Sequence, residues 1–127
     1  MSKQGFYTIA IDLEHAGLIW QPEIGDEVAR REMPEDTAIL VDPMGMGPRD
    51  LRQVFVWLPT IEQLVMQLES RQAILFHAGL ELSEAAMQYK AVIQSPNGSI
   101  EVMASDLRAA VGISLRDLLL LESDSVH

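Results

Sequence analysis

The chain has 127 residues, of which 48% are hydrophobic and 22% are charged, and its nine basic and nineteen acidic residues give a formal charge of −10. This composition predicts a folded chain with one core, because intrinsic disorder requires low hydrophobicity together with high net charge. The negative charge disfavours nucleic acids and anionic membranes as partners, and the absence of cysteine excludes disulfides, thiolate nucleophiles and zinc–cysteine sites.

The start of the chain lacks the apolar core of a signal peptide, and the longest apolar runs are too short to cross a bilayer. Cysteine is also absent, which suits a reducing compartment. We therefore expect a cytoplasmic protein without a membrane partner.

Three segments of the first third carry structural signals. Alternation of side chains over Phe6–Leu13 predicts a half-buried strand, and Gly17 then provides a turn into a short strand over Leu18–Trp20. Residues 22–33 fit two structures equally well. One is a helix with acidic residues in its first turn and arginines late, and the other is a turn at Gly25 followed by a strand that begins at Glu27.

The middle of the chain predicts two strands and a helix. Thr37–Val41 and Val54–Leu58 are compact apolar runs typical of buried strands, and the loop Asp42–Pro48 separates them. Thr60, followed three residues later by Gln63, forms a capping-box pattern at the start of a helix.

The last part of the chain predicts a hairpin and a second helix. Ala73–Phe76 suits a strand, and residues 80–86 suit a short helical turn. Residues 87–94 and 100–103 alternate around an Asn97-Gly98 turn, which predicts a β-hairpin with a well-defined register. A helix is expected from Ser105 as N-cap, with residues 122–127 as a frayed tail.

Together these segments predict one α+β domain over residues 1–127. We expect a mostly antiparallel sheet of about five or six strands, with two or three helices packed against it.

Residues 105–121 also resemble a helix-turn-helix motif, with Gly112 at the turn and Ser114 as a cap for the second helix. The resemblance implies a DNA-binding regulator. Two features depart from the motif. Arg108 occupies a position where a small residue is usual, and the leucines at 118–121 would leave the recognition helix almost without polar groups that read bases.

A protein interface is predicted by two groups of apolar residues. Consecutive positions of a helix differ by about 100° in direction, so four leucines in a row cannot all face one side, and some must meet another element or another subunit. Two methionines on the 42–48 loop also suit a partner surface. The predicted interface residues are Met44, Met46, Leu118, Leu119, Leu120 and Leu121.

A ligand site is a second possibility. Asp42 and Arg49 flank a glycine-containing loop after a predicted strand, where an anion could bind, and His77 could add a polar group to a cleft. Asp12, Glu14 and His15, with His77, contain metal-ligand atoms but complete no known metal motif. We predict no metal or other cofactor, and the sequence identifies no catalytic residues.

The leading functional prediction is a non-catalytic interaction, assembly or regulatory protein that acts through a homodimer or through contact with another protein. The alternatives are a small enzyme or ligand-binding domain with a cleft near Asp42, Arg49 and His77, and a DNA-binding regulator that uses residues 105–121.

Overall fold

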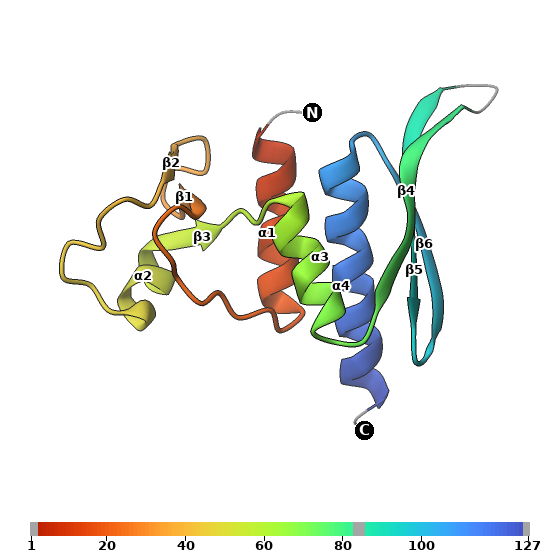
Figure 1. Cartoon of the computed structure of the whole chain (residues 1–127). Helices are drawn as coiled ribbons and strands as arrows, with labels where there is room; N and C mark the ends of the chain where they lie inside the picture. The colour runs from red at the N-terminus through yellow and green to blue at the C-terminus, as the bar shows by residue number, and fades with distance from the viewer. Residues whose placement is uncertain (1–2, 83–85, 126–127) are drawn as a thin grey trace. The chain divides into compact units, whose positions relative to one another are not determined.

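The computed structural model describes residues 3–82 and 86–125, which fall into two compact units, residues 2–59 and residues 60–127. The N-terminal unit contains α1 (Lys3–His15), β1 (Glu27–Arg30), β2 (Thr37–Ile39), α2 (Pro48–Val54) and β3 (Phe55–Trp57). The C-terminal unit contains α3 (Ile61–Glu69), β4 (Ile74–Leu82), β5 (Met87–Ser95), β6 (Gly98–Ala104) and α4 (Leu107–Ser125). Figure 1 shows these elements along the chain.

The α+β class and the antiparallel pairing are confirmed. The strands of the described residues form two three-stranded antiparallel sheets, with orders β2-β1-β3 and β4-β5-β6, instead of one sheet of five or six strands. Strands close in sequence tend to pair with one another, so each half of the chain completes its own small sheet. The prediction that residues 1–127 form one domain stays a prediction.

The segment predicted as the first strand is the helix α1, so that prediction is wrong. Its buried side chains are Phe6, Ile9, Ala10 and Leu13. Their spacing of three, four and seven residues from Phe6 places them on one stripe of a helix, and this period prevails over the alternation that suggested a strand.

The segment after α1 is irregular where a strand was predicted, and the structure decides between the two alternatives for residues 22–33. Leu18–Trp20 is irregular in the structure, although Leu18 and Trp20 are buried and Ile19 is exposed. Gly17 and Gly25 have positive φ angles of 109° and 100°, as turn glycines do. β1 begins at Glu27, so within residues 22–33 the turn-and-strand alternative is confirmed and the helix is wrong.

The strands of the N-terminal sheet bury fewer apolar side chains than the sequence predicts. β2 is found within Thr37–Val41, but it is an edge strand whose Ile39 is exposed, and Leu40 just beyond it is buried. β3 confirms the strand predicted at Val54–Leu58, with Val56 fully buried. The helix α2 was missed, although Pro48 in its first turn is a typical helix start.

The C-terminal unit begins with the predicted capped helix. The Thr60 hydroxyl accepts a hydrogen bond from the backbone N–H of Gln63 at 3.1 Å, and the Gln63 side chain accepts one from the N–H of Thr60 at 2.9 Å. This reciprocal pair confirms the capping box, and Leu64 and Leu68 of α3 are fully buried.

The predicted hairpin is confirmed as β5 and β6, with Gly98 at φ 124° after the turn. Ala91 pairs with Val102 and Ile93 pairs with Ile100, which places the buried side chains on one face. β4 begins where a strand was predicted but continues to Leu82. The predicted helical turn at 80–86 is therefore wrong for residues 80–82, and residues 83–85 lie outside the described part.

The last helix corrects two predictions. α4 runs without interruption from Leu107 to Ser125, so the turn of the helix-turn-helix resemblance is absent from this described segment. Gly112 lies buried inside the helix. The predicted frayed tail is likewise helical as far as Ser125, while residues 126–127 lie outside the described part.

The start of α4 yields a test. Asp106 Oδ1 accepts a hydrogen bond from the N–H of Ala109 at 2.8 Å, so Asp106 takes the capping role predicted for Ser105. We expect Asp106→Ala to lower the free energy of unfolding by about 1 kcal/mol. Ser105→Ala is the matched control and should change it by less than about 0.5 kcal/mol. Urea unfolding followed by circular dichroism measures both, and equal losses would contradict this assignment.

Candidate functional site

The three predicted ligand residues are distributed over both units. Asp42 and Arg49 are exposed in the N-terminal unit, and His77 is exposed on β4 of the C-terminal unit. The Asp42 carboxylate accepts a hydrogen bond from the backbone N–H of Met44 at 2.9 Å, which holds the start of the loop in a local turn. Their convergence in one cleft therefore stays a prediction.

Asp12, Glu14 and His15, which carry possible metal-ligand atoms, lie on α1. Among the described residues, no group of three or more histidine, aspartate or glutamate side chains is arranged to hold a metal ion. Glu14 is instead paired with an arginine of the same unit.

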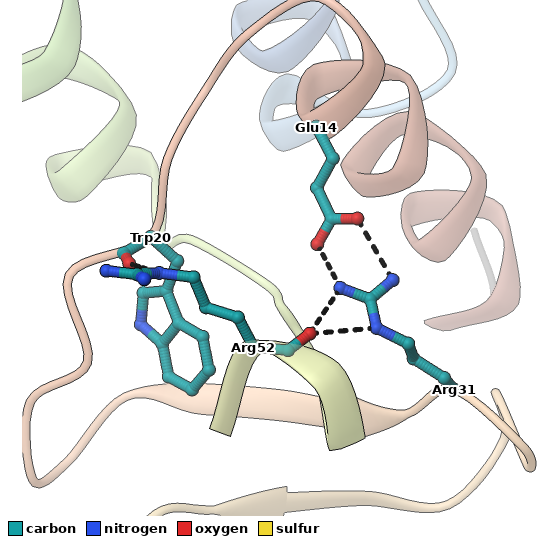
Figure 2. A network of polar contacts seen from close by, with 4 residues as sticks. All are labelled: Glu14, Trp20, Arg31 and Arg52. Atoms are coloured by element: carbon teal, nitrogen blue, oxygen red, sulfur yellow. Dashed lines mark hydrogen bonds and ion pairs between the residues drawn. The ribbon is translucent and has the colours of Figure 1, made fainter. Parts of the chain in front are cut away.

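That arginine, Arg31, is the centre of a polar network in the N-terminal unit, shown in Figure 2. Its guanidinium donates to both Glu14 carboxylate oxygens, at 3.0 and 2.7 Å, and to the backbone carbonyl of Arg52, at 3.0 and 2.7 Å. The bidentate geometry fixes the guanidinium plane. The network joins the last turn of α1 to the residue after β1 and to α2.

Two further hydrogen bonds extend the network to the segment before β1. Arg52 Nε donates to the carbonyl of Trp20 at 2.6 Å, and the Trp20 indole N–H donates to Asp26 Oδ2 at 2.8 Å. The same Asp26 oxygen accepts the backbone N–H of Glu23 at 3.0 Å. These contacts give the irregular 18–26 segment a defined position.

A small hollow of about 140 Å³ lies beside the network. It is lined by Arg30, Arg31, Glu32, Gln53 and Val54. Both arginines at its wall already have acidic partners, since Arg31 binds Glu14 and Arg30 lies 3.7 Å from Asp36. The arrangement explains the local structure of the unit and supplies no free cation for an anionic ligand.

The predicted interface residues differ in accessibility. Met44 is exposed and Met46 is half-buried on the loop before α2. Leu118 and Leu119 are buried, whereas Leu120 and Leu121 are exposed. Only the exposed members are accessible in this structure, and their contact with a partner stays a prediction.

An exposed apolar cluster of the C-terminal unit was not predicted from the sequence. We call it the β4 surface, and it consists of exposed apolar side chains on β4 and at the start of β5: Phe76, Ala78, Leu80, Leu82 and Met87. Phe76, Leu80 and Leu82 are 67%, 53% and 75% exposed. Exposed apolar clusters of this kind are typical of interaction sites.

The pairing of the strands explains the exposure. Ala78, Leu80 and Leu82 pair with Ala91, Tyr89 and Met87 of β5, so they share the sheet face on which Ala91 and Ile93 are buried. α4 covers that face mainly at β5 and β6. In Figure 1 the end of β4 and the start of β5 extend beyond the N-terminal end of α4. The side chains of Leu80, Leu82 and Met87 in this region are exposed.

The opposite face of the same strands is charged. Lys90 Nζ lies 3.1 Å from Glu101 and 3.5 Å from Glu81, which links the three strands. The hydrogen bond with Glu101, reinforced by the charges of Glu101 and Glu81, raises the pKa of Lys90 above its ordinary value of 10.5, although desolvation opposes the rise. From Ala78 to Leu82, one face of β4 is thus apolar, and the other carries a cluster of one ammonium group and two carboxylates.

Apolar residues alternate at 76, 78, 80 and 82, and this alternation is the sequence signal for the surface. The short helical turn predicted over residues 80–86 divided the alternation.

No helix among the described residues is both long and apolar enough to cross a membrane. No protein-family model, curated protein or solved structure matches the chain.

Proposed function

We propose that the chain is a non-catalytic association protein that binds another protein molecule through the β4 surface. The observation that carries the proposal is the exposed apolar face of a strand that also lies at the edge of its sheet. An edge strand offers unpaired backbone groups to an incoming strand, and adjacent apolar side chains add affinity.

The negative charge of the chain is compatible with this role, because Lys90 offsets part of the charge of Glu81 and Glu101 near β4. The absence of cysteine supports a cytoplasmic setting. Leu120 and Leu121 remain a candidate second contact, predicted from the sequence.

Affinity capture from an extract of the native cell tests the proposal with three tagged chains: the natural sequence, Leu80→Lys and Met66→Lys. Both substitutions place the same new charge at an apolar side chain that is at least half exposed in the C-terminal unit, and Met66 on α3 belongs to neither predicted contact, so Met66→Lys is a matched control. We expect a stoichiometric companion, which can be an untagged copy of the chain, to be captured by the natural sequence and by the control but lost with Leu80→Lys. Capture of the same companion by all three, or of none, would contradict the proposal.

A further inference from the structure

We infer that the partner at the β4 surface is a second copy of this chain, with the two β4 strands paired antiparallel about a two-fold axis. This inference rests on the function proposed above and identifies the partner. The product is a six-stranded sheet in which the two β4 strands lie at the centre and each β6 lies at an outer edge.

The first argument is that β4 lacks most of the features that protect an edge strand. Soluble proteins block such edges with charges, prolines, short strands or bulges. β4 has nine residues, contains Glu81 as its only acidic residue and has no proline. Its one irregularity lies between Leu75 and His77, which leaves His77–Leu82 in regular register.

The second argument is geometric. Residues directly opposite each other in an antiparallel pair have side chains on the same face. When a two-fold axis perpendicular to the sheet relates the strands, the two opposing residue numbers always add to an even number. Within the regular segment, even-numbered residues therefore oppose even-numbered residues in every possible register.

In this chain the even-numbered residues of the regular segment are Ala78, Leu80 and Leu82, and all are apolar and exposed. A second copy therefore matches apolar side chains with apolar side chains across the seam in any register. The odd-numbered residues, His77, Gly79 and Glu81, meet on the other face with Lys90 beside Glu81. A partner of unrelated sequence would need to supply this pattern independently.

The third argument is the amount of surface. At roughly 100 Å² of accessible apolar area per exposed side chain, the four large side chains of the β4 surface offer roughly 400 Å² per copy. Pairing in the plane of the sheet covers only the flanks of these side chains that face the seam, so two copies bury less than about 800 Å² before the paired backbone is counted, below the roughly 1,200 Å² of stable protein interfaces. The surface suits a dimer of low affinity.

Charge supplies a test that separates a second copy from a basic partner. Each chain carries a net charge of −10, so two copies repel one another at long range. Raising sodium chloride from about 0.1 M to about 1 M shortens the screening length from about 10 Å to about 3 Å. Self-association should therefore strengthen with salt, whereas binding of a cationic partner would weaken.

Sedimentation equilibrium of the purified full chain provides the measurement. We expect a monomer–dimer equilibrium at tens of micromolar that shifts towards dimer at the higher salt concentration. Leu80→Lys should raise the dissociation constant at least about tenfold, and Met66→Lys, at an exposed residue outside both predicted contacts, should leave it within about twofold of the natural value. Thermal unfolding of each variant establishes that it is folded.

A distance between the two copies identifies the contact. The chain has no cysteine, so Gln88→Cys, on β5 and outside the seam, can carry a single spin label. Gln88 pairs with Glu81, so for any two-fold axis within His77–Leu82 the two residues at position 88 lie less than about 35 Å apart. A dipolar distance below this limit is expected, and a longer distance would overturn the inference.

The remaining outcomes are decisive and distinguish the two proposals. A chain that stays monomeric at both salt concentrations but captures a companion only when Leu80 is intact would overturn the second-copy inference and leave the proposed function standing. A dimer unaffected by Leu80→Lys, or one that weakens with salt, would also overturn the inference. Monomeric behaviour together with no β4-dependent capture would overturn both.

Discussion

Leu118→Ala should lower the free energy of unfolding by about 2–5 kcal/mol, because Leu118 is 1% exposed and its truncation would leave a cavity in the core under α4. Leu120 lies two positions further along the same helix and is 47% exposed. Leu120→Ala should therefore change the free energy of unfolding by less than about 0.5–1 kcal/mol.

Chemical denaturation with urea, followed by far-ultraviolet circular dichroism, measures both leucine variants. The two substitutions remove the same atoms from the same helix, so helix propensity cancels in their difference. Similar losses for the two would contradict the orientation of α4. They would also show that Leu120 is covered in solution, which would favour its predicted interface role.

Trp20→Phe should destabilise the protein by about 1–3 kcal/mol more than Trp57→Phe does. Both indoles are nearly buried, with 5% exposure for Trp20 and 9% for Trp57. The Trp20 N–H donates to buried Asp26, whereas Trp57 Nε1 is a buried nitrogen without a hydrogen-bond partner among the described residues. Only the first substitution removes a buried hydrogen bond to a carboxylate, and Asp26 Oδ2 then keeps the backbone N–H of Glu23 as a donor.

The two tryptophan variants serve as controls for each other, since each loses the same ring atoms and creates a similar void. Urea unfolding should be followed by circular dichroism, because indole fluorescence changes with either substitution. If Trp57→Phe proved as costly as Trp20→Phe, the hydrogen bond to Asp26 would not contribute measurably to stability.

Features determined by neighbouring residues were predictable from the sequence. The capping box at Thr60 and Gln63 and the hairpin around Asn97-Gly98 depend on contacts within a few residues, and both are confirmed. The location of β3 was also predicted, because a short apolar run between polar segments has few alternatives.

Features determined by distant contacts were missed. Phe6–Leu13 fits two periods at once, and only packing of its Phe6, Ile9, Ala10 and Leu13 stripe selects the helix. Gly112 has an intrinsic helix cost of about 1 kcal/mol, which suggested a turn, yet the buried residues around it keep α4 continuous.

The candidate interaction surface also depends on distant contacts, so it could not be predicted from the sequence. Leu80 and Leu82 are exposed because they lie beyond the residue at which α4 begins to cover the sheet, and no local sequence pattern specifies that position. The apolar character of these residues was visible in the sequence, but their accessibility was not. Leu118 and Leu119 were equally apolar and are buried, so composition alone could not separate a contact surface from a core.

The two edges of the C-terminal sheet differ, and this difference limits how far the protein could polymerise. β6, at the other edge, has seven residues, and Glu101 lies in the middle of it. Pairing of β4 with β4 uses up the longer edge strand of both molecules, because the two-fold axis joins each β4 only to the other. Further growth would have to begin at β6, which is two residues shorter, and this limits fibre formation by strand addition.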